Sequence, residues 1–397
     1  MADMEKLYTE RLKRYVTAMR NEKPDRVPIR PFVAEFTAKY CGYTSHEVSY
    51  DYEKAFAAAR KCAADFDWDA VVGNMVYGWM GLVHAIGLKY YAVPGVDIPP
   101  DTGFQYIEPP EDQAWMQADE YDQLIEDPTG YLFNVWLPRV SGDVSPIGQP
   151  STFRNNMSFL RGGMAMLTYF GGFGTQAARL RAESGTVSAI SGILKAPFDI
   201  IADKLRGYKG LCVDMYRQPD KLLQAMEALT PMFIQLGVDA AKRGGNPLIF
   251  MPLHKGADGF LSDEQFKKFY WPTLRKVIMG LVDEGCVPFI WAEGGYNSRL
   301  EVIRDLPKGK TAWLFDLTDM AKAKKALSGI ACVAGNMPMD LLTVGTPQEA
   351  RDHAKKLIDT CGKGGGYIMA NGAFFDEVRW ENLKAIVDTV KEYGVYK

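Results

Sequence analysis

Two stretches decide the fold: residues 246–256 read NPLIFMPLHKG, and residues 286–295 read CVPFIWAEGG. Each is a short apolar run, 248–253 or 287–292, that ends at a polar residue with glycine close behind. Between them Ser262 opens a helical pattern with Asp263 and Glu264 in its first turn, the usual composition of a helix start. Short apolar runs that alternate with helices are typical of α/β folds with a parallel sheet.

The same alternation extends in both directions from these two runs. Six strands are predicted from residue 180 onward, at 187–191, 248–253, 287–292, 311–315, 330–334 and 366–370. Two earlier ones are predicted at 26–31 and 69–74, each after a helical segment. Helices are expected over 214–242 and from the Thr346-Pro347-Gln348-Glu349 cap. Eight such units predict a (β/α)8 TIM barrel with an N-terminal helical extension. A doubly wound sheet is less favoured, because neither a Gly-x-Gly-x-x-Gly nor a phosphate loop follows any strand.

The barrel pattern is interrupted once. Residues 93–150 are rich in Pro, acidic and aromatic residues and are expected to be an insertion within a single domain over residues 1–397. The glycine-rich Tyr169–Gly174 (YFGGFG) indicates a mobile segment, and residues 151–180 are a candidate lid. Either segment could equally be a surface elaboration with no part in catalysis.

Composition excludes several classes of protein. The 397 residues are 47% hydrophobic with a formal net charge of -3, so the chain has material for a large core and no general attraction to nucleic acid or anionic lipid. No apolar run is long enough to span a bilayer, and the charged start does not resemble a secretory signal. The six cysteines form no Cys-x-x-Cys pair. We therefore expect a cytoplasmic protein that binds neither nucleic acid nor membrane.

In a barrel the chemistry lies at the C-terminal ends of the strands. The residues that follow the predicted strands are polar, and aromatic residues lie near them. The predicted substrate-binding set is Glu35, Asn74, Tyr77, Lys195, Trp291, Tyr296, Asn336 and Asn371. His254 and Glu293 are the predicted catalytic pair, since they follow the two strongest strands and could act as acid and base.

The same pair could instead hold a divalent metal such as Zn²⁺, with Asp316 as the third ligand. The alternative for Asp316 is that it caps the next helix. The sequence leaves these two interpretations open.

Motifs spread over nearly the whole chain resemble the uroporphyrinogen decarboxylase superfamily. The segments that carry the resemblance are Pro24-Asp25-Arg26-Val27-Pro28, Asp69-Ala70 with Ala85-Ile86-Gly87, Ala196-Pro197-Phe198 with Leu205-Arg206-Gly207, Phe269-Tyr270-Trp271-Pro272, Gly335-Asn336-Met337-Pro338 with Gly345-Thr346-Pro347, and Gly365-Gly366-Tyr367-Ile368 with Glu381-Asn382-Leu383. Their order matches that of the superfamily, which implies a barrel.

The residues that bind substrate or zinc in two branches of that superfamily are replaced in this chain. The arginine-rich segment by which true uroporphyrinogen decarboxylases grip their substrate is replaced by residues 29–36, which hold one Arg, and Asn74 stands near the position of their aspartate. The thiol-methylating branch binds zinc through two cysteines, whose positions read Glu293 and Asn371-Gly372-Ala373 here. Neither porphyrin decarboxylation nor thiol methylation is therefore expected.

The resemblance then implies a methyltransferase that moves a methyl group from a small methylated aromatic donor, an aryl methyl ether, to the cob(I)alamin of a separate corrinoid protein. Cobalamin would arrive on that partner, because the chain has no Asp-x-His-x-x-Gly motif. Relatives suggest a homodimer. Two alternatives stay open: a decarboxylase of a small aromatic carboxylic acid, and a non-catalytic ligand-binding barrel.

Overall fold

Eight parallel strand segments close into a barrel in the computed structural model, which describes residues 2–73, 80–110 and 113–397. Six strands form a continuous sheet in the order β10-β9-β8-β7-β6-β5, and β1 pairs with β4. Residues 26–33 close the ring: Arg30 N donates to Met369 O, and Ala70 N donates to Ile29 O. Because β4 and β5 belong to one run of chain, the ring has the eight members that the sequence predicts.

The strands are β1 (Ala70–Val71), β2 (Tyr91–Ala92), β3 (Gln105–Tyr106), β4 (Val187–Ser188), β5 (Gly192–Ile193), β6 (Leu248–Leu253), β7 (Val287–Ala292), β8 (Ala312–Phe315), β9 (Cys332–Ala334) and β10 (Tyr367–Ile368). All of β6 and all but the first residue of β7 are buried. Burial on both faces explains why these strands are continuous apolar runs without alternation.

The helices before the sixth strand are α1 (Ala2–Met19), α2 (Phe36–Tyr40), α3 (Ser45–Tyr50), α4 (Tyr52–Asp65), α5 (Met80–Ile86), α6 (Tyr121–Glu126), α7 (Pro128–Tyr131), η2 (Leu132–Trp136), α8 (Leu137–Val140), α9 (Phe153–Ser184), α10 (Pro197–Ile200), η3 (Ile201–Leu205), α11 (Tyr208–Arg217) and α12 (Pro219–Gly244). Those after it are α13 (Asp263–Gln265), η4 (Phe266–Tyr270), α14 (Trp271–Asp283), α15 (Leu300–Ile303), α16 (Met320–Leu327), α17 (Met339–Thr343), α18 (Pro347–Leu357), η5 (Ile358–Gly362) and α19 (Trp380–Tyr393). No helix among the described residues is long and apolar enough to cross a membrane.

Two helices begin at the N-cap residues that the sequence predicts. Ser262 and Thr346 each form a capping box with the residue three positions later. The single helix predicted over 214–242 is wrong, because α11 ends at Arg217 and α12 begins with Pro219 at its first turn. Proline lacks an amide hydrogen and disfavours helix in the residue before it, so it starts a new helix here.

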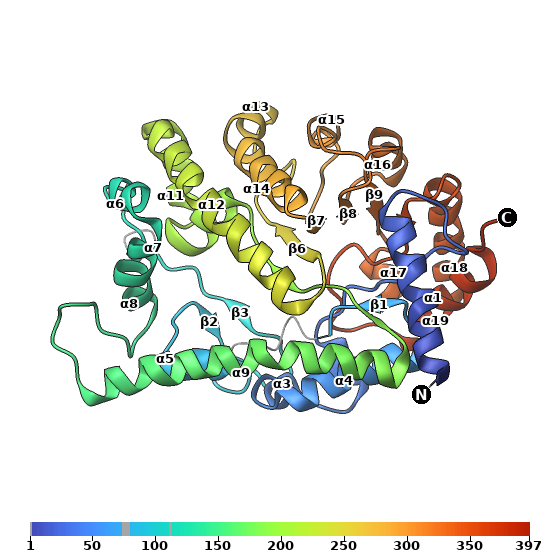
Figure 1. The fold of residues 1–397 in the computed structure, drawn as a ribbon, viewed down its shortest axis with the longest axis horizontal. Coiled ribbons are helices and arrows are strands. Elements are labelled where there is room, and N and C mark those ends of the chain that lie inside the picture. The colour runs from blue at the N-terminus through green and yellow to red at the C-terminus, as the bar shows by residue number, and fades with distance from the viewer. Residues whose placement is uncertain (1, 74–79, 111–112) are drawn as a thin grey trace.

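The insertion over residues 93–150 contains more regular structure than the sequence indicates. It supplies β3, which pairs antiparallel with β2, and the short helices α6, α7 and α8. The three helices lie together at one end of the molecule in Figure 1, and β3 lies beside β2 nearer its centre.

The glycine-rich segment Tyr169–Gly174, which is predicted to be mobile, is part of the 32-residue helix α9. Figure 1 shows α9 along one side of the molecule, where it packs against α5, α4 and α1. Each glycine costs a helix about 1 kcal/mol relative to alanine. Packing of one helix face explains why the glycines do not interrupt it.

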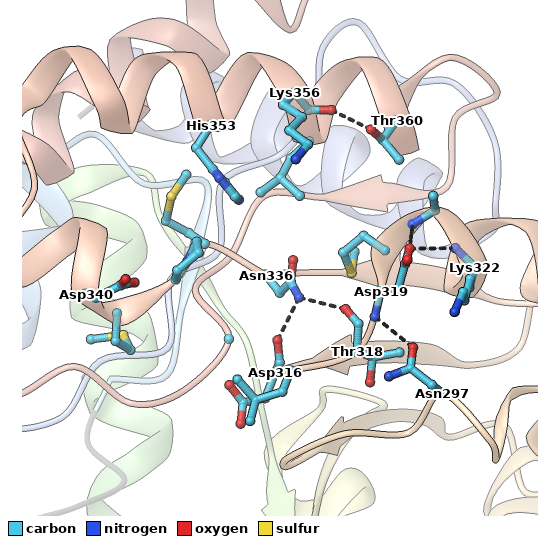
Figure 2. A pocket seen from close by; sticks show the side chains of 18 residues that line it. Asn297, Asp316, Thr318, Asp319, Lys322, Asn336, Asp340, His353, Lys356 and Thr360 are labelled. Atoms are coloured by element: carbon cyan, nitrogen blue, oxygen red, sulfur yellow. Dashed lines mark hydrogen bonds between the residues drawn. The ribbon is translucent and has the colours of Figure 1, made fainter. Parts of the chain in front are cut away.

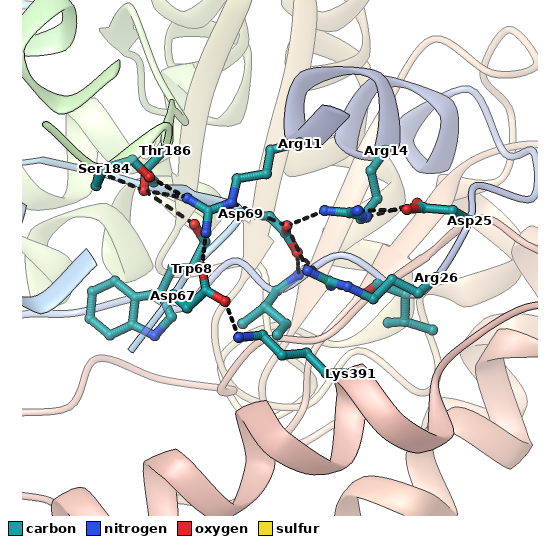
Figure 3. Close-up of polar contacts among 12 residues, drawn as sticks. Arg11, Arg14, Asp25, Arg26, Asp67, Trp68, Asp69, Ser184, Thr186 and Lys391 are labelled. Atoms are coloured by element: carbon teal, nitrogen blue, oxygen red, sulfur yellow. Dashed lines mark hydrogen bonds and ion pairs between the residues drawn. The ribbon is translucent and has the colours of Figure 1, made fainter. Parts of the chain in front are cut away.

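Charged residues tie the helical extension to the N-terminal ends of the first strands. The fully buried Asp69 accepts from Arg14 at 2.7 Å and from Arg26 at 2.8 and 2.9 Å, and also from the Ile29 amide. Arg11 bonds to Asp67, which also pairs with Lys391 (Figure 3). Two of the family-like motifs, around Arg26 and Asp69, thus meet in one ionic network.

Candidate active site

Four polar residues follow four adjacent strands at one end of the barrel. Lys195, His254, Glu293 and Asp316 come directly or closely after β5, β6, β7 and β8. Because the strands are parallel neighbours, their C-terminal ends lie side by side. The predicted catalytic pair is brought together: His254 Nε2 lies 3.9 Å from Glu293 Oε2.

Asp203, in η3, organises these side chains. Its carboxylate lies 2.6 Å from Lys195 Nζ and 2.7 Å from His254 Nδ1, and 3.8 Å from Lys255 Nζ. Burial alone would raise the pKa of Asp203, but the hydrogen bond from His254 and the charge of Lys195 outweigh it and lower that pKa. An ionised carboxylate only accepts hydrogen bonds, so Nδ1 of His254 is the protonated nitrogen and Nε2 faces Glu293.

Asp199, one helical turn before Asp203, fixes the backbone under His254. It is fully buried and accepts from the amides of His254 and Lys255 at 2.9 and 3.0 Å, and from the Tyr270 hydroxyl at 2.7 Å. Burial, with the charge of Asp203, raises the pKa of Asp199. The sequence analysis missed both aspartates. Their spacing of four after Ala196-Pro197, which places them on one helix face, was the available signal.

Among the residues that the structure describes, Glu293 and Asp316 have no hydrogen-bonded cation. Glu293 is about half exposed, and burial raises its pKa while the charge of His254 opposes the shift. Burial also raises the pKa of Asp316, whose Oδ2 accepts from Gly294 N at 3.0 Å. Asn336 lies beside them, because its amide donates to the backbone oxygens of Asp316 and Thr318.

Glu35, after the first strand, is covered by the insertion. Its side chain is buried, and burial with a hydrogen bond to Asp376 raises its pKa to about 8. Gly103 of the insertion packs directly on it, since a Cβ added there would lie 2.0 Å from Glu35 Oε1. A larger residue at this position would displace the carboxylate.

Three other predicted substrate-binding residues are placed in packing roles. Trp291 is buried in the barrel, 4.8 Å from the Phe32 ring, and donates to Gly372 O. Tyr296 has no exposed surface. Asn371 bonds through its amide to both backbone groups of Phe32. The predicted residues Asn74 and Tyr77 lie outside the described residues.

A box of three tyrosines lies next to the Asp203 cluster. Nζ of Lys204 lies 4.0, 5.0 and 4.1 Å from the ring centroids of Tyr90, Tyr91 and Tyr106. Burial lowers the pKa of Lys204 to about 7. Lys195 lies 5.7 Å from the Tyr106 ring, so the antiparallel β2–β3 pair places an aromatic surface beside the predicted site.

A cavity of about 910 Å³ adjoins the strand ends on the side of α16 and α18. Figure 2 shows Asp316 and Thr318 on one side of it and His353 and Lys356 on the other. Burial lowers the pKa of His353. Asp316 lines this cavity, and its charge contributes to the raised pKa of Glu293.

The zinc prediction does not fit the donor arrangement. In the part of the chain that the structure describes, no three His, Cys, Asp or Glu side chains are grouped so that they could hold a metal ion. Nδ1 of His254 is bound to Asp203, and Asp316 is turned toward the Gly294 amide. Catalytic zinc needs about three protein ligands. We therefore derive no step through a metal.

Comparison with known families and relatives gives two kinds of sequence match. The model of the family described as "Uroporphyrinogen decarboxylase (URO-D)" matches residues 170–393. The uroporphyrinogen decarboxylase of Chlorobaculum parvum is 25% identical over 183 residues, which are 45% of this chain and 51% of the relative. That of Neisseria gonorrhoeae is 25% identical over 225 residues, 53% of this chain and 61% of the relative. The chain thus spans less than two thirds of these curated relatives.

A solved structure extends the likeness to the whole chain. A methyltransferase from Methanosarcina mazei superposes with a TM-score of 0.64 at 17% identity, covering 96% of this chain and 98% of the other. At this identity the similarity is one of fold. It includes the insertion and the helical extension as well as the barrel strands.

Proposed function

Because this chain belongs to the uroporphyrinogen decarboxylase family, we propose that it uses the family's barrel as a methyltransferase. It takes the methyl group of a small aryl methyl ether and delivers it to the cob(I)alamin of a separate corrinoid protein. The observation that carries the proposal is the line of side chains Asp203–His254–Glu293 at the strand ends. The whole-chain likeness to a methyltransferase fold supports it.

The reaction requires a proton at the leaving oxygen. The methyl–oxygen bond breaks, the oxygen keeps its electron pair, and the methyl group forms its new bond with the electron pair of the cobalt nucleophile. A phenolate is a reluctant leaving group, so a general acid that protonates the oxygen lowers the barrier. The other product is then the free phenol.

Glu293 is suited to give that proton. Burial raises the pKa of its carboxyl, which favours the protonated acid at a half-exposed position. Glu293 is about half exposed, so water returns a proton to it after each turnover, while His254 presents its unprotonated Nε2 at 3.9 Å. Asp203 acts through His254 as a positioning residue, because it holds Nδ1 protonated and so orients the ring.

The substrate ring is expected beside the insertion. The Tyr106 ring, which is 43% exposed, lies 5.7 Å from Lys195 Nζ, and aromatic surfaces favour flat, apolar ligands. This placement keeps the ether oxygen near the strand ends while the ring contacts the β2–β3 pair.

The test is methylation of added cob(I)alamin by a panel of methoxylated aromatic compounds, followed by the change in the corrinoid absorption spectrum. Transfer from at least one ether, with release of the matching phenol, is the expected result. Metal analysis of the same sample, and an assay with a chelator, check the proton-donor mechanism. A chelator that stops transfer would contradict it.

One observation favours a second candidate, a decarboxylase of a small aromatic acid. The ammonium groups of Lys195 and Lys255 lie 2.6 and 3.8 Å from Asp203, where they could hold a substrate carboxylate. Glu293 would then protonate the carbanion left by carbon dioxide. Release of carbon dioxide without any corrinoid would assign this activity instead.

A further inference from the structure

Two cysteines lie in contact where α2 meets α4. Cys41 is the first residue after α2, and its Sγ lies 3.9 Å from Ala58 O in α4. Cys62 follows Ala58 by four residues, which places it on the same face of that helix. The two thiols are hydrogen-bonded to each other. The fold therefore brings together two sulfur atoms that are far apart in the chain.

The two thiols differ in exposure. Cys41 is half-buried, whereas Cys62 has no exposed surface. A Cβ added to Gly42, the next residue after Cys41, would meet nothing within 4 Å, so there is open space beside Cys41. A small reagent from solvent can therefore reach Cys41 but not Cys62.

The hydrogen bond between the thiols also makes them chemically different. The bond from Cys62 lowers the pKa of Cys41, and burial opposes that shift. The charge of Lys61 lowers the pKa of Cys41 further, while the charge of Asp65 raises it. The pKa of Cys62 is raised, chiefly by burial and then by its bond to Cys41. Cys62 is therefore the donor in this bond, and Cys41 is the sulfur that more readily becomes a thiolate, the reactive form.

We propose that this pair is a site of reversible oxidation, at which a peroxide oxidises Cys41 and Cys62 then closes a disulfide bond. Cysteines that sense oxidants combine access to solvent, thiolate character and a second thiol close by. Cys41 has the first two properties, and Cys62 supplies the third. The short helix α2, which begins directly after Glu35, would then be tied to α4 at its other end.

The oxidation proceeds in two steps. The Cys41 thiolate attacks one oxygen of hydrogen peroxide, the O–O bond breaks, and Cys41 becomes a sulfenic acid while the other oxygen leaves as hydroxide. Cys62 gives its proton to that hydroxide, and its sulfur attacks the Cys41 sulfur, so that the S–S bond forms as the S–O bond breaks. The second hydroxide takes up the proton that Cys41 lost at the start. Two thiols are thus oxidised to one disulfide, and the peroxide is reduced to water.

Cys212, in α11, is the matched case within the same chain. It is also half-buried, but its thiol is hydrogen-bonded to the Tyr208 hydroxyl. The remaining cysteines, Cys286, Cys332 and Cys361, are buried. Comparison of Cys41 with Cys212 therefore separates the effect of exposure from the effect of a neighbouring thiol.

The first experiment treats the reduced chain with a small molar excess of hydrogen peroxide at neutral pH and counts its thiols after denaturation. We expect the count to fall from six to four and to return to six after treatment with dithiothreitol. Mass spectrometry of proteolytic fragments should find Cys41 joined to Cys62. Six thiols that survive the peroxide, a disulfide between other cysteines, or oxidation of Cys41 without a disulfide overturns the proposal.

The second experiment tests the roles of the two cysteines. In Cys62→Ser the oxidised Cys41 has no thiol to react with, so its sulfenic acid should accumulate and be trapped by dimedone. Cys41→Ser should keep all five of its thiols under the same treatment. Cys212→Ser is the control and should still form the disulfide between Cys41 and Cys62. Circular dichroism checks that the three variants keep their helices. Dimedone labelling of Cys62 in Cys41→Ser, or labelling of Cys212 as strong as that of Cys41 in Cys62→Ser, overturns the assigned roles.

Discussion

The two ends of the barrel both carry clusters of charged side chains, yet the clusters differ in how their charges are neutralised. At the N-terminal ends of the strands the Asp69 carboxylate is bonded by Arg14 and Arg26 and by a backbone amide. At the C-terminal ends cations neutralise Asp203, while no cation in the described part of the chain is bonded to Glu293 or Asp316.

The pKa values of Asp25, at one end of the barrel, and of Glu293 and Asp316, at the other end, are shifted in opposite directions. At the N-terminal end, burial would raise the pKa of Asp25, but the bond from Arg14 outweighs it and the pKa is lowered. At the C-terminal end the pKa values of Glu293 and Asp316 are raised, chiefly by burial. One cluster holds ions that stabilise the fold, and the other holds acids that can transfer a proton.

The largest expected effect comes from removing the acid at the C-terminal end. Glu293→Gln keeps the size of the side chain but has no proton to give, so methyl transfer should fall by about 10³-fold. The cob(I)alamin assay measures the loss, and circular dichroism checks the fold. Glu301→Gln, an exposed substitution on α15, is the control. Full transfer by the Glu293 variant would remove this residue from the mechanism.

Substitutions in the Asp69 cluster, at the N-terminal ends of the strands, should lower the free energy of unfolding and leave turnover unchanged. Asp69→Asn leaves the charge of Arg26 buried without its carboxylate partner and removes one of the two carboxylates that Arg14 bonds, which should cost about 3–5 kcal/mol in the free energy of unfolding. Urea denaturation measures that cost. Asp25→Asn is the matched control, because Asp25 bonds to the same Arg14 but its side chain is 62% exposed, and it should cost less than about 1 kcal/mol. An equal loss in the free energy of unfolding for the two variants would contradict the view that the buried Asp69 carboxylate holds this cluster together.

A smaller effect is expected for the one neutralised carboxylate of the C-terminal cluster. Asp203→Asn no longer fixes the proton on His254 Nδ1, so kcat should fall by about 10²-fold and the pH profile of kcat should change shape. The KM for the ether should stay the same. Asp203→Glu should recover part of the rate, whereas loss of KM alone would indicate a binding role.

The smallest effect is a pH dependence of stability at Glu35. Its pKa is raised from 4.5 to about 8 in the folded protein. Between these two pH values the folded chain holds a proton that the unfolded chain has lost. The stability that Glu35 contributes is therefore complete below about pH 4.5 and is lost as the pH rises through about 8. Over that window Glu35→Gln should gain stability relative to wild type by up to about 1.4 kcal/mol per pH unit.

Thermal or urea denaturation at several pH values checks this slope. Glu377→Gln is the control, because Glu377 is exposed and bonded to Lys39. Its stability curve should run parallel to that of the wild type from about pH 6 upward. A Glu35→Gln curve that is also parallel would show that Glu35 is ionised in the folded chain.

The sequence was sufficient for the barrel because its longest strands, β6 and β7, are almost entirely buried and so read as apolar runs, as at 248–253. It also placed His254 and Glu293 together, since adjacent parallel strands end at one side of the sheet. It could not identify Asp203, which lies in a helix after β5 and reaches His254 only through the tertiary fold. The sequence did not show that residues 169–174 are helical, because glycine has a low helix propensity and the packing of α9 against α5 and α4 depends on the tertiary fold.

The contact between Gly103 and Glu35 links the packing of the insertion to a proton. The Gly103 backbone lies against the Glu35 carboxyl, and burial is the main reason for the raised pKa of that group. Loss of the contact would hydrate Glu35, which would then release its proton at neutral pH. Mild acidity therefore favours the contact between Gly103 and Glu35.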